Sequence, residues 1–217
     1  MCQDFSCLVT RSYQVAWKRG VSSHDHLETL FRDEMLELTN RRSYFKAEIT
    51  PSGGYLHPEK PWNFAIDEDE PSWFTAAHKV EAMRAFRKWK KETYALINLD
   101  EARNPINPLF GKPRKPTKKD IELLKQWASV RDSVGDSVRD SVRDSVGASV
   151  GASVRASVGA SVGAYTGSLF NIWDGKYKFQ PVVDLWKRGF VASFDEKTWR
   201  LHSGKESEIV YELTHIK

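Results

Sequence analysis

Residues Trp127–Val162 read WASV RDSV GDSV RDSV RDSV GASV GASV RASV GASV, which is nine consecutive four-residue units. Two degenerate units follow, at residues 163–166 and 167–170. Repeated units of this kind dictate a fold, because each unit packs against its neighbours. The rest of the chain is therefore one segment before this array and one segment after it.

The period of four decides which regular structure the array favours. In an α-helix of 3.6 residues per turn, each Val is offset from the previous one by about 40°, so the valines form no stable stripe. Val, Ser, Asp and Gly are also moderate to poor helix formers. In an extended chain, by contrast, every Val points to one side and every Ser to the other. We therefore predict a short tetrapeptide-repeat β-solenoid, with an irregular helix and a flexible low-complexity segment as the alternatives.

The predicted solenoid has a core of inward-facing valines. These are Val130, Val134, Val138, Val142, Val146, Val150, Val154, Val158 and Val162. The second position of the unit is Asp in the units at 132–144 and Ala in those at 148–160, so a coil of four units stacks Asp on Ala and avoids facing like charges. The array resembles pentapeptide-repeat β-solenoids, whose square coils use five residues per side.

The segment before the array predicts a compact domain over residues 1–102. Alternating apolar residues, helical stripes and turn residues place two strands in 6–17, a helix in 22–38, strands at 44–50 and 62–66, and a helix at 76–97. This is an α+β domain in the order ββαββα. Residues 103–120 contain several prolines and lysines and are predicted to be a basic linker.

The remaining chain is predicted to be a helix-capped array, 121–170, and a small α+β cap, 171–217. A short helix at 120–128 leads into the array. After it we expect a helix at 182–188, a hairpin from 190–194 and 198–202, and a strand at 208–214. Such a cap covers the open end of a solenoid, which is otherwise an adhesive edge. The fold class predicted for the whole chain is α+β.

Composition sets limits on location and partners. The 217 residues carry a formal net charge of +4, a mild excess that permits an anionic partner without requiring one. Two Cys do not make a disulfide framework, and no apolar run reaches the roughly 20 residues of a spanning helix. The N-terminus lacks a signal-peptide pattern. We therefore expect a cytoplasmic protein with no membrane partner.

Several sequence features together indicate a relationship. They are the opening Met-Cys, the Glu-Ile-Thr-Pro segment at 48–51, the DSV-type array, and a tail that reads Asp-Leu-Trp-Lys-Arg-Gly at 184–189 and Thr-Trp-Arg-Leu-His at 198–202. In these features the whole chain resembles hypothetical proteins of phage and environmental sequence collections. The resemblance implies a phage-related origin and carries over no activity or functional residue.

One basic cluster is the strongest candidate binding site. It consists of Lys112, Arg114, Lys115, Lys118 and Lys119. Such residues contact phosphates without reading bases, although a solvated linker has the same composition. The adjacent carboxylates at 67–70 are typical of a solvated turn and are too loose a pattern for a metal.

Metal and nucleophile candidates are weaker. Cys2, Cys7, His24 and His26 could supply zinc ligands, but Cys-x4-Cys and His-x-His lie outside the common finger spacings. Removal of Met1 would expose Cys2 as an N-terminal nucleophile, with no supporting motif after it. We therefore predict no catalytic residue, no metal and no cofactor.

The function predicted from the sequence is that of a non-catalytic structural or interaction protein built on the Ser/Val array. A protein partner or self-association is expected, because exposed solenoid ends favour oligomers. One alternative is a nucleic-acid-associated protein that uses the basic segment. The other is a small metal- or Cys-dependent hydrolase in the N-terminal domain, so the question of an enzyme stays open and the sequence favours none.

Overall fold

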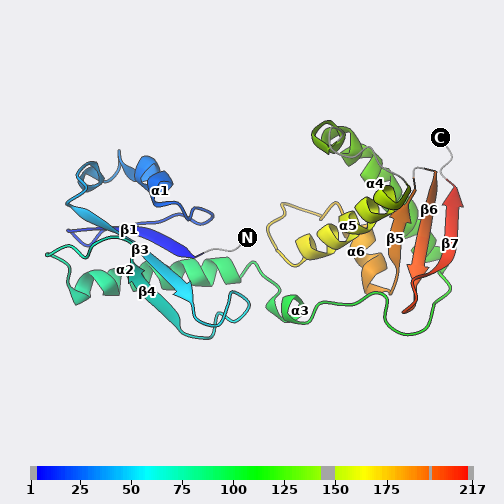
Figure 1. Cartoon of the computed structure of the whole chain (residues 1–217), viewed down its shortest axis with the longest axis horizontal. Helices are drawn as coiled ribbons and strands as arrows, with labels where there is room; N and C mark the ends of the chain where they lie inside the picture. Colours follow the sequence, from blue (N-terminus) through cyan, green and yellow to red (C-terminus); the bar gives the residue numbers. More distant parts are fainter. Residues whose placement is uncertain (1–3, 143–149, 196, 215–217) are drawn as a thin grey trace. The chain divides into compact units, whose positions relative to one another are not determined.

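The computed structural model describes residues 4–142, 150–195 and 197–214, with side chains outside 131–157. The chain divides into two compact units, an N-terminal unit of residues 1–97 and a C-terminal unit of residues 98–217 (Figure 1). Each unit has a β-sheet and helices, so the α+β class agrees with the prediction.

The N-terminal unit is built on a four-stranded antiparallel sheet in the order β2-β1-β3-β4. Its elements follow the predicted order ββαββα, with one 3-10 turn added after the first helix. They are β1 (Phe5–Thr10), β2 (Val15–Ala16), α1 (His24–Phe31), η1 (Leu36–Thr39), β3 (Tyr44–Pro51), β4 (Trp62–Ile66) and α2 (Ala76–Tyr94).

Strand β1 is buried on both faces because helices cover both sides of the sheet. Its side chains alternate, as those of any strand do. Phe5 and Cys7 point toward α2 and join a core that includes Phe86. Leu8 points to the opposite face and packs with Leu27 of α1. Figure 1 shows α1 and α2 on opposite sides of this sheet.

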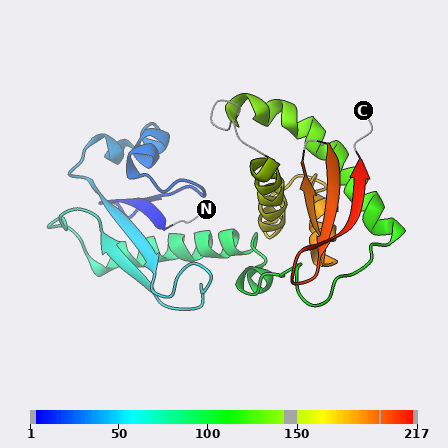
Figure 2. The ribbon, with the colours of Figure 1, turned by 45° about the vertical axis from the view of Figure 1, so that its right-hand side comes forward.

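The C-terminal unit has a three-stranded antiparallel sheet in the order β5-β6-β7. Its elements are α3 (Leu99–Arg103), α4 (Lys118–Val142), α5 (Val150–Ser168), α6 (Gln180–Lys187), β5 (Val191–Phe194), β6 (Thr198–Ser203) and β7 (Glu208–Thr214). Helices α4, α5 and α6 share one core with the sheet face that carries Trp199 and Leu201. Figure 2 shows the helices of this unit, green to orange, beside its orange-to-red sheet. Trp127 and Tyr165, at the two ends of the array, both lie in that core.

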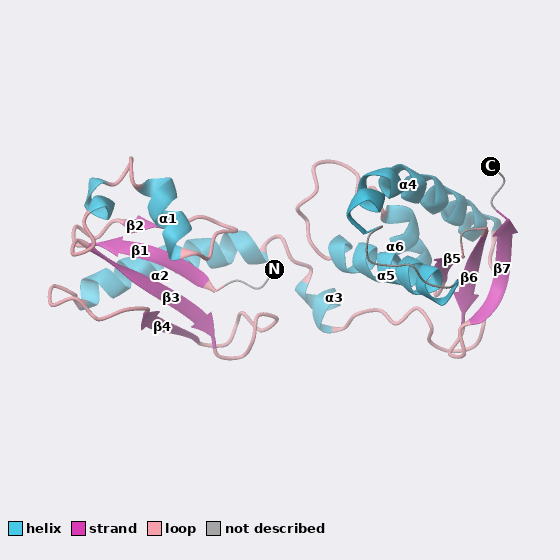
Figure 3. Cartoon of the chain, turned by 45° about the horizontal axis from the view of Figure 1, so that its top comes forward, coloured by secondary structure: helices cyan, strands magenta, loops and turns pink. Residues whose placement is uncertain are grey.

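The predicted β-solenoid is wrong. Within the described part of the array, residues 127–142 continue α4 and residues 150–162 belong to α5, and no strand occurs there (Figure 3). Of the predicted core valines, Val130 and Val158 are half-buried and Val162 is 43% exposed. The side chains of Val134, Val138, Val142, Val150 and Val154, and the whole of Val146, lie outside the described residues.

Both helices are fixed by short amphipathic segments at the ends of the array. Leu124, Trp127 and Ala128 are buried at the i, i+3, i+4 spacing of one helix face. At the other end, Ala164 and Tyr165 are buried on adjacent positions of α5. Around a helix, the position of successive valines shifts by about 40° per unit, which is a small change over one or two turns. A period of four is therefore compatible with a helix that is anchored only where it leaves the array.

Helix α4 also has a strong start. The backbone N–H of Thr117 donates to Asp120 Oδ2 at 2.7 Å, and the N–H of Asp120 donates to Thr117 Oγ1 at 3.4 Å. This reciprocal pair is a capping box, which satisfies two backbone donors at the first turn. Arg188 adds a salt bridge to the 1% exposed Asp120, so the start of α4 is joined to the end of α6.

Candidate functional site

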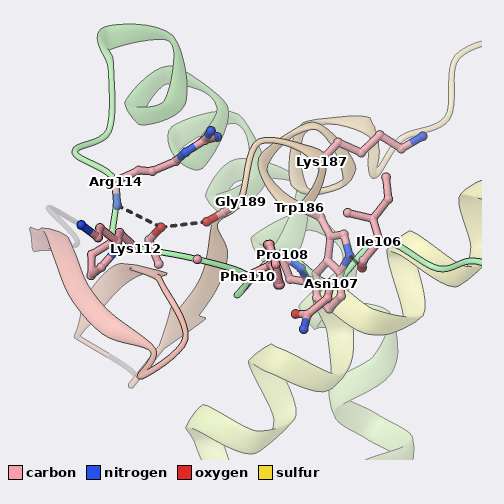
Figure 4. A pocket seen from close by; sticks show the side chains of 12 residues that line it. Ile106, Asn107, Pro108, Phe110, Lys112, Arg114, Trp186, Lys187 and Gly189 are labelled. Carbon is pink, nitrogen blue, oxygen red and sulfur yellow. Dashed lines mark hydrogen bonds between the residues drawn. The ribbon is translucent and has the colours of Figure 1, made fainter.

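A hollow of the C-terminal unit lies where the Pro-rich segment 106–114 crosses the end of α6. It has a volume of about 490 Å³. We call this hollow the Phe110 pocket (Figure 4). Its lining consists of Ile106, Asn107, Pro108, Phe110, Gly111, Lys112, Pro113, Arg114, Trp186, Lys187, Gly189 and Ser203.

Hydrogen bonds hold the segment in place at both ends of the pocket. At one end, Trp186 Nε1 donates to the carbonyl of Ile106 at 2.8 Å, and the N–H of Ile106 donates to Tyr165 Oη at 2.8 Å. At the other end, the N–H of Arg114 donates to Ser203 Oγ at 3.3 Å (Figure 4). The segment is therefore anchored on the surface of this unit at both ends of the pocket.

Two glycines allow this close approach. Gly204 has φ +76°, and a Cβ at this position would lie 2.7 Å from the backbone nitrogen of Pro113. Gly189 has φ +87° and follows α6, where its carbonyl accepts a hydrogen bond from Ser203 Oγ at 3.0 Å. A side chain at Gly204 would push the segment off the sheet, so the shape of the pocket depends on that residue.

The pocket is positively charged. Lys112 and Arg114 are exposed, and within the described part of the chain neither forms a salt bridge. The Arg114 side chain is oriented by a 3.3 Å hydrogen bond from Nη1 to the carbonyl of Arg188. Lys187 is neutralised by Glu101, which lies 2.9 Å from its Nζ. Because no Asp or Glu lines the pocket, two full positive charges face solvent there.

An exposed aromatic ring stands beside these charges. Phe110 is 87% exposed, the highest value among the large apolar residues of the described chain. Burying a Phe ring contributes roughly 1.5–3 kcal/mol. Folding does not gain this free energy at Phe110, whereas a ligand that covers the ring could gain it. Trp186 supplies a second ring, whose Nε1 is already occupied by Ile106.

The structure separates the five predicted phosphate-contacting residues into two groups. Lys112 and Arg114 line the pocket, whereas Lys115, Lys118 and Lys119 are exposed along the path from the pocket into α4. Sequence analysis missed Phe110, Trp186 and Lys187. A signal existed for Phe110, since a large apolar residue in a polar, Pro-rich segment far from any helical or strand pattern has no core to enter.

The four zinc candidates do not form a site in the described residues. Cys7 is fully buried against α2, and burial raises the pKa of its thiol strongly. His24 is buried on the other face of the sheet, His26 is exposed, and Cys2 lies outside the described residues. Among the described His, Cys, Asp and Glu side chains, no three come close enough to hold a metal ion.

A second concentration of charge surrounds Lys46 in the N-terminal unit. Its Nζ lies 3.2 Å from Glu68, 3.5 Å from Asp25 and 3.7 Å from Glu28. Burial lowers the pKa of Lys46, but the hydrogen bond and charge of Glu68 outweigh that effect, so the pKa is raised. A lysine held protonated in this way is a structural cation and not a nucleophile.

The carboxylate run 67–70 takes part in this cluster. Asp67 lies 3.4 Å from His24 Nδ1, and Glu68 lies near Lys46 and 3.6 Å from Arg41. Asp69 and Glu70 are exposed. The first half of the run therefore connects the turn after β4 to helix α1, and the cluster has a structural explanation.

No family model, no curated protein and no solved structure matches the chain. Among the described residues, no helix is long and apolar enough to cross a membrane. The function must therefore be inferred from the chemistry of the Phe110 pocket.

Proposed function

We propose that this protein is a non-catalytic binding protein whose C-terminal unit holds single-stranded nucleic acid in the Phe110 pocket. The observation that carries the proposal is the 87% exposed Phe110 beside the unpaired cations of Lys112 and Arg114. Single-strand binders combine these two elements, because cations follow the phosphates and a ring stacks on an unpaired base. The lysines at 115, 118 and 119 extend the positive surface along the strand.

A double helix fits the pocket less well. The bases of a duplex are stacked inside it, so Phe110 could reach none of them without opening the helix. Among the described lining residues, α6 contributes only Trp186 and Lys187 and the sheet only Ser203, so neither presents a row of polar side chains for reading a groove. The pocket thus favours an unpaired strand and reads no sequence.

The experiment is a titration of a fluorescent oligothymidylate, followed by anisotropy, with the full-length protein at several salt concentrations. Affinity should fall as salt rises, and the double variant Lys112→Gln/Arg114→Gln should reduce the log–log slope by about 1.4, since each single-strand phosphate contact contributes about 0.7. Phe110→Ala should weaken binding by roughly tenfold while keeping the slope, because stacking of a base is worth about 1–3 kcal/mol.

The matched control is Lys18→Ala/Arg19→Ala, which removes the same charge from exposed positions of the N-terminal unit. It should change affinity and slope far less than the pocket variant. Equal losses from the two double variants, or no retention of the oligonucleotide at low salt, would reject the proposal.

Other predictions from the sequence stay predictions. Self-association, a protein partner, a phage-related origin and a cytoplasmic location are compatible with this proposal, and none of the contacts described above bears on them. The solenoid surface that was expected to support an interaction is replaced by helices α4 and α5.

A further inference from the structure

A second hollow of the C-terminal unit has a different chemistry. It follows the end of α5 and has a volume of about 210 Å³. We name it the Trp173 pocket; its lining includes Ser168, Phe170, Asn171, Trp173, Tyr177 and Gln180. Three of these residues are aromatic and three are neutral hydrogen-bonding residues. No charged residue lines it, in contrast to the Phe110 pocket.

Hydrogen bonds to α5 orient two of the three aromatic rings of this pocket. Trp173 Nε1 donates to the carbonyl of Gly167 at 3.2 Å, and Tyr177 Oη donates to the carbonyl of Ala164 at 2.8 Å. The polar atoms of both side chains are therefore occupied by α5. Trp173 is nevertheless 46% exposed, so part of its ring surface is accessible to a ligand in the pocket.

Gly167 makes this arrangement possible. A Cβ at that position would lie 2.6 Å from Tyr177 Oη and 3.8 Å from the Trp173 ring. Only a glycine allows both rings to approach the last turn of α5 so closely.

The hydrogen-bonding groups of the pocket are amides and a hydroxyl. Gln180 Nε2 donates to Asp184 Oδ1 at 2.7 Å, which fixes the amide orientation and leaves Oε1 as an acceptor. The exposed Asn171 side chain has both a donor and an acceptor and makes no hydrogen bond to any described residue. Ser168 Oγ donates to the carbonyl of Tyr165 at 2.7 Å and can still accept.

These features define the ligand. Trp173 and Tyr177 are in contact, with ring centroids 5.0 Å apart and an interplanar angle of 39°, so a flat base cannot enter between them. A ligand must instead lie on one face of Trp173 and make neutral hydrogen bonds around its rim. The volume is below the roughly 300–1,000 Å³ of a drug-sized site, so it accommodates one small ring.

We propose that the Trp173 pocket binds one ring of a neutral saccharide. The C–H face of a pyranose packs on the negative face of the indole, and its hydroxyl groups exchange hydrogen bonds with Asn171 and Gln180. A phosphate-bearing ligand finds no cation in this lining. The site is therefore separate from the Phe110 pocket in position and in chemistry, and it does not depend on the function proposed there.

The test uses the full-length protein and three neutral probes: cellotriose, maltotriose and N,N′,N″-triacetylchitotriose. Saturation-transfer NMR should show magnetisation passing to the ring protons of at least one of them. Trp173→Ala should weaken that binding by roughly fivefold, since ring contacts of this kind are worth about 1 kcal/mol. Trp173→Phe should retain part of it, and Asn171→Ala should weaken it without affecting the fold.

Two controls make the result decisive. Phe110→Ala removes the other exposed ring of this unit and should leave saccharide binding unchanged. Thymidine monophosphate tests for an anionic or base-binding site and should give no transfer that depends on Trp173. The proposal is overturned if none of the three sugars receives saturation, if Trp173→Ala binds as well as the parent protein, or if the nucleotide binds through Trp173.

Discussion

Asp120 is the clearest example of a single residue that connects two helices. It is 1% exposed, caps α4 together with Thr117 and forms a salt bridge with the guanidinium of Arg188. Burial raises the pKa of this carboxyl, but the hydrogen bonds of Arg188 and Thr117 outweigh burial and hold the pKa below its ordinary value. The charged form is therefore bound more tightly in the folded state than in the unfolded chain.

The direction of the pH effect follows from that lowered pKa. The stabilisation is complete above the unfolded value, about 3.9, and is lost as pH falls through the lower folded value. Asp120→Asn should cost about 2 kcal/mol at pH 7, from a weakened cap and a lost ion pair, and much less near pH 2. Urea denaturation at the two pH values measures the difference.

The control for this prediction is Asp174→Asn, an exposed carboxylate in a turn. It should change the free energy of unfolding little at either pH. A loss at Asp120 that is equal at pH 7 and pH 2 would contradict a role for its charge.

Sequence reasoning at the residue scale found the charges of the site but not its ring. Lys112 and Arg114 stand out because like charges cluster in the sequence. Phe110 is significant because it is exposed, and its exposure depends on the path of segment 106–114 past the end of α6. That path is set by distant partners, Ser203 and Trp186, which no local pattern connects to it.

Among the elements, α5 gives the sharpest test of the helical array. Gly159 lies in α5, is exposed, and has no neighbour within 4 Å of where a Cβ would be. Gly159→Ala should therefore stabilise the unit by roughly 0.5–1 kcal/mol, because Gly is a poorer helix former than Ala. Gly159→Pro should destabilise it by about 3 kcal/mol. Thermal melting followed by far-UV circular dichroism measures both.

Gly167→Ala is the matched comparison within the same helix. Its new Cβ would lie 2.6 Å from Tyr177 Oη, so this Gly-to-Ala change should lower the melting temperature where the one at 159 raises it. Tolerance of proline at 159, as expected at a turn between extended units, would argue against the helix.

Most elements outside the array are predictable because each carries its own signal, whereas the short α3 and η1 were not predicted. The strands of both sheets alternate or are bounded by turn residues, and α2 has an apolar face that packs on β1 and β3. The array gave a misleading signal. Because four is an even number, its Val and Ser residues fall on opposite sides of an extended chain, whereas on a helix the same spacing forms no stable apolar stripe. The deciding residues, Leu124 and Trp127 at one end and Tyr165 at the other, belong to short amphipathic segments whose partners come from α6 and the β5-β6-β7 sheet.

At the scale of the whole molecule, each unit has the contents of an independent domain. The N-terminal unit encloses Phe5, Phe86 and Trp89 around its own sheet, and the C-terminal unit encloses Trp127 and Trp199 around another. Units of roughly 100 residues bury enough apolar surface to fold alone. Both proposed binding sites are made entirely of residues from the C-terminal unit.

This division predicts that fragments 1–97 and 98–217 each fold. Each should unfold cooperatively in urea, because each has a closed core and a paired sheet. Fragment 98–217 should also retain oligonucleotide binding with the salt dependence of the full chain. A shorter fragment, 121–217, lacks segment 106–114 and the Thr117–Asp120 cap, so it should be less stable and should lose that binding. Failure of fragment 98–217 to unfold cooperatively would show that the C-terminal unit depends on the rest of the chain.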